Sequence, residues 1–356
     1  MARKPVASGV TPRHVSIVAL PDATVSTLFG IYDVLSFFAR RDPSAAASAP
    51  FHVEIVGEAV GPLGLASGVT VDVQRSIDTI DASDILIVPS VVLSPGGWRK
   101  DRYPRVIEWI RRMHQRGAVL CSACSGLFLL AETGLFDGHA ATVHYGAART
   151  FADTYPAVPI SPERVLMISG AHEELVTSGA SVAWHDLVLH LIARYAGSAA
   201  AQEIAHAFAL EWHHEGLTPY IVFDGRSDHG DASIQIAQQW LSTHFAVASP
   251  VEETLKRSKL AERTFKRRFA AATGLAPIAY VQRLRIEDAK RRLEKTTAPV
   301  DEISWRVGYE DPAFFRRLFK RTTGLAPSEY RKRFHVPEFA KPAARSRRRR
   351  LSSAEA

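Results

Sequence analysis

The chain has 356 residues, 46% of them hydrophobic and 23% charged, which is too long for one ordinary compact domain and typical of a protein that buries real cores. Its net charge of +7 is unevenly divided, because residues 1–231 carry 17 Lys and Arg against 24 Asp and Glu (−7), whereas residues 232–356 carry 27 against 13 (+14). No apolar run approaches bilayer length, residues 1–14 are not followed by a signal-peptide core, and two cysteines cannot form a disulfide scaffold, so we expect a soluble cytoplasmic protein without membrane contacts.

Residues 12–212 are predicted to form an α/β domain, because short apolar runs alternate with helical patterns. The strands expected from these runs are 14–20, 51–56, 85–88, 118–121 and 174–177, and the expected helices are 27–38, 105–116, 181–195 and 199–211. The strands are apolar throughout rather than alternating, which favours a mostly parallel sheet with helices on both faces.

The turn-rich residues 213–231 are predicted to be a linker, which separates the acidic part of the chain from the basic one. The basic residues 232–336 are predicted to form an all-α domain, and residues 337–356 a basic, disordered tail. Nucleic acid is the expected partner of this charge, because no basic amphipathic helix or lipidation signal points to a membrane.

The strongest pattern in the basic part is an internal repeat with an offset of 50 residues. Phe265, Phe269, Thr273, Gly274-Leu275-Ala276-Pro277 and Tyr280 recur as Phe315, Phe319, Thr323, Gly324-Leu325-Ala326-Pro327 and Tyr330. In each copy the two Phe residues lie four apart on one helix face, and the Gly and Pro end that helix. A shorter helix is expected before each copy, at 251–258 and 300–307, so the repeat predicts two helix-turn-helix units.

The second helix of each unit is the candidate reader of duplex DNA, because basic residues lie outside its Phe stripe. Arg can bind guanine through two hydrogen bonds, Lys and Arg can bind phosphate, and Phe or Thr can contact a thymine methyl group. A helix at 278–294 would hold the two readers about one duplex turn apart. The candidate DNA-binding residues are Arg263, Thr264, Lys266, Arg267, Ala313, Phe314, Arg316, Arg317, Lys320 and Arg321.

Five segments of this domain resemble the AraC/XylS family of transcription regulators: 261–269 (AERTFKRRF), 274–277 (GLAP), 307–311 (VGYED), 314–320 (FFRRLFK) and 324–331 (GLAPSEYR). The resemblance implies two helix-turn-helix units joined by a linker helix, with the first unit usually the more base-specific. One departure is Ala261, where the family often has a helix-capping Ser, so Glu262 is expected to replace the cap in part through the helix dipole.

In the α/β domain, residues 118–130 (AVLCSACSGLFLL) pass from an apolar strand through small residues into an apolar helix, as a nucleophile elbow does. Cys124 is expected at the tip of this elbow. With His144 in the segment ATVHYG, this part resembles the class I glutamine amidotransferase-like superfamily, and specifically the PfpI-like sensing domains fused to AraC-type readers.

The resemblance also argues against catalysis by Cys124, which needs a base to form the thiolate and a third group to orient that base. PfpI-like enzymes commonly have His directly after the elbow Cys, where this chain has Ser125, and their acidic residue near the elbow is replaced by Ser26. We therefore expect a degenerate pocket in which Cys124, Ser125 and His144 bind a ligand, with no catalytic residues and no cofactor.

The cysteines and histidines also suggest two other kinds of site. Cys121 and Cys124 fit a C-x-x-C redox pattern, but Cys121 is expected to point away within the strand. No metal site is expected, because His213-His214, His172 and His185 lack ligand spacing.

The sequence therefore predicts a DNA-binding transcription regulator, controlled by a small molecule and acting as a homodimer. Resemblance suggests an amine or an amino-acid-related effector. Two alternatives remain open: a cysteine amidase or hydrolase that carries a DNA-binding domain, and an architectural DNA-binding protein without a ligand. The sequence does not determine the effector, the operator, the direction of regulation or any residual reactivity of Cys124.

Overall fold

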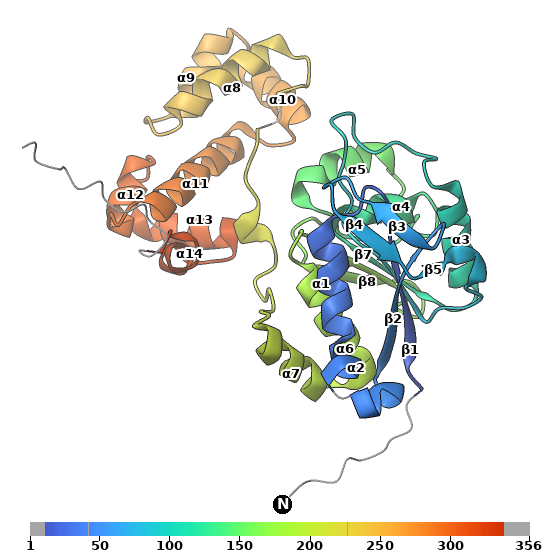
Figure 1. Ribbon diagram of the computed structural model, residues 1–356. Helices are drawn as coiled ribbons and strands as arrows, with labels where there is room; N and C mark the ends of the chain where they lie inside the picture. The colour runs from blue at the N-terminus through green and yellow to red at the C-terminus, as the bar shows by residue number, and fades with distance from the viewer. Residues whose placement is uncertain (1–10, 42, 226, 338–356) are drawn as a thin grey trace, which may run out of the picture. The chain divides into compact units, whose positions relative to one another are not determined.

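The computed structural model describes residues 11–41, 43–225 and 227–337, and the chain separates into two compact units, residues 1–221 and 222–356 (Figure 1). Within these described ranges, no helix is long and apolar enough to cross a membrane. The predicted tail lies outside the described residues, apart from Pro337.

The described part of the first unit contains a seven-stranded sheet in the order β5-β2-β1-β6-β7-β9-β8. All neighbours pair in parallel except β8, which is antiparallel to β9, so the prediction of a mostly parallel sheet is confirmed. A separate hairpin of β3 and β4 was not predicted. The strands are β1 (Arg13–Val18), β2 (Phe51–Gly57), β3 (Gly61–Gly64), β4 (Thr70–Val73), β5 (Arg75–Ser76), β6 (Ile85–Val88), β7 (Val119–Ala123), β8 (Leu166–Ser169) and β9 (Leu175–Ser178).

Helices cover both faces of this sheet, because successive apolar side chains of each strand point to opposite sides. On β6, Ile85 and Ile87 join one core with α1, α6 and α7, and Leu86 and Val88 join the other with α3, α4 and α5. The helices are α1 (Val25–Leu35), α2 (Phe37–Arg41), α3 (Pro104–Gln115), α4 (Leu127–Ala131), α5 (Ala148–Thr154), α6 (Trp184–Ala196) and α7 (Ser198–Phe208), with 3-10 turns η1 (Pro43–Ser48), η2 (Ile77–Thr79), η3 (Cys124–Gly126), η4 (Tyr145–Ala147) and η5 (Thr218–Tyr220).

Three expected helices differ from the observed ones by more than one residue at an end. The helix expected at 27–38 is two helices, and at the break the Ser36 hydroxyl donates a hydrogen bond to the Tyr32 carbonyl. The helix expected at 181–195 begins at Trp184. The helix expected at 199–211 ends at Phe208, because Ala209 adopts a left-handed conformation with φ of 52°.

The second unit is all-α in its described residues, as predicted. It contains two helix-turn-helix pairs, α9 with α10 and α12 with α13, and the long helix α11 connects them (Figure 1). Its helices are α8 (Ala232–His244), α9 (Pro250–Ser258), α10 (Glu262–Thr273), α11 (Pro277–Lys295), α12 (Val300–Arg306), α13 (Pro312–Thr323) and α14 (Pro327–Phe334).

The repeated residues build the same local structure twice. Phe265 and Phe269 are buried, as are Phe315 and Phe319, and the second Phe of each pair packs edge-on against the following Tyr280 or Tyr330. At each helix end a Thr hydroxyl bonds the carbonyl four residues earlier, and a Gly with positive φ follows, 76° at Gly274 and 82° at Gly324. The repeat is therefore a packing and helix-ending device, which leaves the opposite helix face free.

Candidate functional site

The reader helices α10 and α13 expose the basic residues named from the sequence. Arg263, Lys266 and Arg267 are exposed on α10, where Thr264 is half-buried. All six candidates on α13 are exposed, namely Ala313, Phe314, Arg316, Arg317, Lys320 and Arg321. Because the Phe pairs anchor the opposite faces, each reader presents one fixed cationic surface.

The basic residues of α10 differ in how free they are. Lys266 forms an ion pair with Glu262 one turn earlier. Arg268, which was not a candidate, donates two hydrogen bonds to Asp231 at the start of α8, at 2.8 and 2.6 Å. Arg263 and Arg267 have no hydrogen bond or ion pair within the described ranges, so on α10 they are the arginines available to a base.

The start of α13 is better capped than the start of α10. The Asp311 carboxylate accepts a hydrogen bond from the Ala313 N–H at 2.8 Å, whereas Ala261 supplies no side-chain cap. The Phe314 ring is 39% exposed and lies 5.8 Å from the Tyr309 ring, which holds it at the surface. The cap and this contact fix the start of the second reader.

One candidate on α13 is already paired. Arg316 forms an ion pair with Asp301 of α12, in which the two side chains are 48% and 46% exposed. The Asp301 carboxylate therefore competes with any anion for the Arg316 guanidinium, and Asp301 was missed by sequence reasoning.

Cys124 lies at a strained turn between β7 and the short helix α4. Its φ is 53°, a conformation that is costly for a residue other than glycine. Two residues later, a Cβ on Gly126 would lie 2.5 Å from the carbonyl oxygens of Val88 and Pro89. This close approach of backbone forces the sharp turn, and the geometry is that of a nucleophile elbow.

Ser125 is buried and holds the loop after β6. Its hydroxyl donates to the Val91 carbonyl at 2.6 Å and accepts from the Val91 N–H at 3.0 Å, and the residue is buried. Its donor and one acceptor position are thus both used inside the protein.

The residue of α1 that lies near the elbow is Thr27, so the expectation for Ser26 was wrong. Ser26 is exposed, whereas Thr27 is buried and donates a hydrogen bond to the Ser90 hydroxyl. The Ser90 hydroxyl contacts the carbonyl of Ala123, the residue before the elbow cysteine. A short chain of hydroxyl groups therefore occupies the place where the resemblance implies an acid.

The two cysteines are free thiols in different surroundings. Cys121 is fully buried in β7, and burial raises the pKa of its thiol. The Sγ of Cys124 lies 3.7 Å from the Ser181 hydroxyl, and the residue is 4% exposed. Since Cys121 lies within the strand, the pair lacks the shared helix start of a thioredoxin-type motif.

His144 lies two residues after Thr142, whose backbone N–H donates a hydrogen bond to the Thr177 hydroxyl near the carboxyl end of β9, so the segment that contains His144 runs beside this end of the strand. Burial lowers the pKa of His144, which favours the neutral ring. Its Nδ1 accepts a hydrogen bond from the Gly146 N–H at 3.1 Å, so the proton is on Nε2. The lone pair that a general base would use is therefore occupied, and no hydrogen bond to Cys124 occurs in the described part of the chain.

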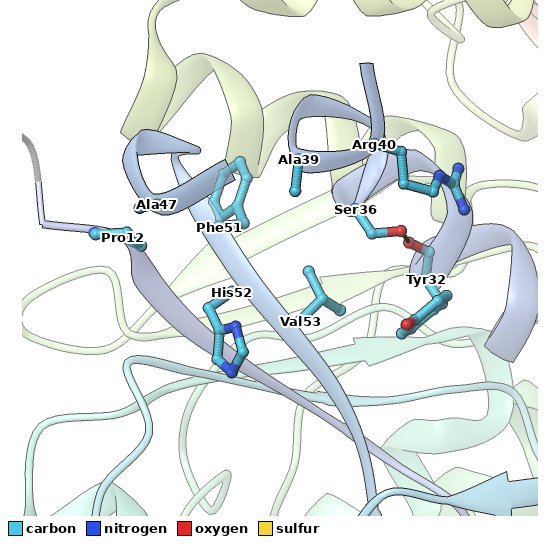
Figure 2. A pocket seen from close by; sticks show the side chains of 9 residues that line it. All are labelled: Pro12, Tyr32, Ser36, Ala39, Arg40, Ala47, Phe51, His52 and Val53. Carbon is cyan, nitrogen blue, oxygen red and sulfur yellow. Dashed lines mark hydrogen bonds between the residues drawn. The ribbon is translucent and has the colours of Figure 1, made fainter. Parts of the chain in front are cut away.

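Two cavities lie at opposite ends of the strands β1 and β2. One of about 290 Å³, at the carboxyl ends of β1 and β2, is lined partly by Glu58, Arg102 and Tyr103. Another of about 480 Å³, which Figure 2 shows, lies beside the first residues of β2. Its polar side chains already have partners: Arg40 bonds Asp33, and the Tyr32 hydroxyl accepts from Gln74. Open α/β sheets bind ligands at their carboxyl edge, which favours the smaller cavity and the elbow.

One group of side chains has atoms close enough to hold a metal ion, among the described residues: His14, His52 and Glu54, with ligand atoms within 4.8 Å. Sequence reasoning missed this cluster. Burial raises the pKa of Glu54, but hydrogen bonds from His14 and Arg75 outweigh it and leave that pKa below its usual value. With Arg75 only 3.0 Å from the carboxylate, the group is an ion-pair cluster. His213 is likewise satisfied, since it bonds Asp186.

Family models match both parts of the chain. The model of the DJ-1/PfpI family matches residues 28–193, and a model of a helix-turn-helix domain matches residues 255–333.

Two relatives resemble the chain over more than half of its length. The HTH-type transcriptional regulator CdhR of Pseudomonas aeruginosa is 25% identical over 304 residues, which cover 80% of this chain and 84% of CdhR. The HTH-type transcriptional regulator GlxA of Rhizobium meliloti is 24% identical over 219 residues, covering 58% and 63%. A crystal structure of an AraC family transcriptional regulator from Pseudomonas putida is 16% identical, covers 55% of this chain and all of its own, and gives a TM-score of 0.47. The chain is therefore a DNA-binding transcription regulator in which residues 28–193 match the DJ-1/PfpI family and residues 255–333 match a helix-turn-helix domain.

Proposed function

We propose that α10 and α13 enter successive major grooves of an operator, while the N-terminal domain binds a small effector that changes how a homodimer sits on this DNA. The observation that carries the proposal is the duplicated reader, in which buried Phe pairs fix two exposed cationic helix faces. α11 has 19 residues and is about 28 Å long at 1.5 Å per residue, which suits readers one duplex turn apart.

The roles of the reader residues follow from how free each side chain is. Arg263 and Arg267 on α10, and Arg317 on α13, are assigned to base edges, since a guanidinium held on a helix can bind guanine through two hydrogen bonds. Phosphate contacts are assigned to four side chains that give up an ion pair or lie near the helix end, and apolar contacts to three others. The phosphate set is Lys266, Arg316, Lys320 and Arg321, and the apolar set is Thr264, Ala313 and Phe314.

The effector site is assigned to the carboxyl edge of the sheet, with Cys124 and His144 as direct contacts. Ser125 acts through the Val91 loop that it holds. The protonated Nε2 of His144 would donate to a carboxylate or carbonyl oxygen, which suits an amino-acid-related metabolite; an amine is the other effector class that the sequence resemblance implies. In this proposal the effector-binding domain spans residues 12–212, the linker 213–231 and the DNA-binding domain 232–336. The first helix of the DNA-binding domain, α8, begins at Ala232.

A cysteine hydrolase is the second candidate, which the strained elbow at Cys124 favours. Against it stand the occupied Nδ1 of His144 and the hydroxyl chain of Thr27 and Ser90, which supplies no acid. We therefore propose a binding pocket without turnover, in a protein that works in the cytoplasm because its DNA lies there.

The first experiment is a salt titration of duplex binding by the full-length chain. Each phosphate neutralised releases a counterion, so the logarithm of the binding constant should fall by about 0.9 per phosphate and per unit of log salt. A flat salt dependence, or no binding at low salt, contradicts DNA binding.

A thermal-shift screen with amines and amino acids tests effector binding by the N-terminal domain, and His144→Ala should remove the shift in melting temperature that any hit produces. Sedimentation analysis of the same samples tests the homodimer.

A further inference from the structure

The DNA-binding unit contains two separate hydrophobic cores that share one helix. The first core, around Phe265 and Phe269, takes Tyr280 and Val281 from α11. The second core, around Phe315 and Phe319, takes Ile286, Ala289 and Leu293 from the same helix. Figure 1 shows α11 running from the group α8–α10 to the group α12–α14. Because no common core spans both groups among the described residues, their relative orientation depends on α11 and on the contacts beside it.

Arg285 lies on α11 between these two cores, and its guanidinium bonds backbone carbonyls of both groups. Nε donates to the Phe245 carbonyl at 2.7 Å and Nη2 to the Val247 carbonyl at 3.1 Å, in the loop after α8. Nη1 donates to the Gly308 carbonyl at 2.7 Å, in the turn of the second helix-turn-helix pair. One side chain therefore links the first group to the turn that places α13.

The two groups also approach each other closely beside Arg285. A Cβ on Gly308 would lie 2.5 Å from the Ala246 carbonyl oxygen, and Gly308 has a φ of 92°. The Arg285 guanidinium also lies 4.9 Å from the centre of the Tyr309 ring. Three carbonyl oxygens and the Tyr309 ring therefore surround the guanidinium. Its planar fork of N–H groups donates to all three carbonyls at once, whereas a lysine ammonium cannot keep the same geometry.

We propose that Arg285 is a positioning residue that fixes the base-pair spacing at which α10 and α13 read DNA. The inference rests on the proposed reading of DNA by these two helices. A residue with this role does not touch DNA. It holds the two readers at one separation and one rotation, so that a site with the wrong spacing cannot engage both.

The test uses full-length protein and the strongest duplex that the wild-type chain selects from a random pool. Its two boxes are located by single-base substitution, and a second duplex has one base pair inserted between them. The insertion moves one box by about 3.4 Å and rotates it by about 34°. A third duplex keeps only the box read by α10.

For wild type we expect the insertion to weaken binding about tenfold or more, since one reader loses its bases. Arg285→Lys and Arg285→Ala should reduce this ratio to about threefold or less, while affinity for the single-box duplex stays as in wild type. Arg283→Ala is the matched control, because Arg283 is exposed two residues earlier on the same helix, and it should keep the wild-type ratio.

Two results would overturn the proposal. One is an unchanged spacing ratio in both Arg285 variants. The other is an equal loss on the single-box duplex, which would mean that Arg285 supports the first unit itself. Arg285→Lys keeps the test valid if Arg285→Ala does not fold, as judged by circular dichroism. Failure of the proposed function would look different, because wild type would then bind none of the three duplexes.

Discussion

Asp301 forms an ion pair with Arg316 of the reader helix α13, so its carboxylate competes with a phosphate for the guanidinium. We predict that Asp301→Ala tightens DNA binding, because the released guanidinium no longer has to exchange partners. The substitution also removes a negative charge close to the DNA backbone, which acts in the same direction.

The size of the effect follows from the exposure of the pair. Both side chains are almost half exposed, and exposed ion pairs contribute about 0.2 to 1 kcal/mol. If DNA binding breaks the pair, a variant without it does not have to give up this energy. Its affinity for DNA is then higher by up to about fivefold. We therefore expect Asp301→Ala to bind about two- to fivefold more tightly, and Arg316→Ala to bind more weakly by a similar factor on all sequences, as a phosphate contact should.

Fluorescence anisotropy with one operator duplex at one fixed salt concentration measures this cycle. In the Arg316→Ala background the gain from Asp301→Ala should shrink, because only the long-range charge effect remains. Glu302→Ala is the matched control, since it removes the same charge one residue away but releases Arg306 of its own helix. Weaker binding by Asp301→Ala, or an undiminished gain in the Arg316→Ala background, would refute the reasoning.

Three further predictions concern the elbow and the first helix-turn-helix unit. Cys124→Ala should leave amidase and glyoxalase-type turnover at background, because the His144 lone pair is occupied; wild-type turnover abolished by this change would contradict the account. Gly126→Ala should destabilise the protein by about 1–3 kcal/mol, since the new Cβ meets two backbone carbonyls, and an unchanged melting temperature would disprove the clash. The hydrogen bond from Arg268 lowers the pKa of Asp231 below its usual 3.8, so the pair stabilises above that pH and stops doing so as the pH falls through the lowered value. The free energy of unfolding, measured with denaturant as the pH is lowered into this range, should fall less in Asp231→Asn than in wild type, and equal losses would contradict the prediction.

Features with a short period were predictable from the sequence. The Phe265 and Phe269 spacing, repeated 50 residues later, predicted the reader helices and their buried faces because four residues make about one helical turn. Cys124 was placed at the elbow because an apolar strand, small residues and an apolar helix follow one another directly. Both patterns involve residues that lie close together in the chain, so a single sequence is enough to recognise them.

The sequence did not predict features that depend on how a residue is oriented around its helix axis or on hydrogen bonds to backbone carbonyls. Ser26 was named where Thr27 faces the elbow, and neighbouring residues on a helix point about 100° apart, so a shift of one residue exchanges an exposed position for a buried one. The contacts of Arg285 were invisible because its partners are backbone carbonyls, which any residue could supply. The antiparallel strand β8 was not predicted, although Leu166, Met167 and Ile168 form a short apolar run; its side chains are only partly buried or exposed.

The central claim is that α10 and α13 read two different segments of one operator. Selection from a random duplex pool, run in parallel with wild type, Arg267→Ala and Arg317→Ala, tests it most directly. The account predicts that Arg267→Ala relaxes preference at one or two base pairs in one box, and that Arg317→Ala does so in a second box centred about 10 base pairs away. Relaxation of the same box by both variants, or a uniform loss of affinity without a change in preference, would contradict it.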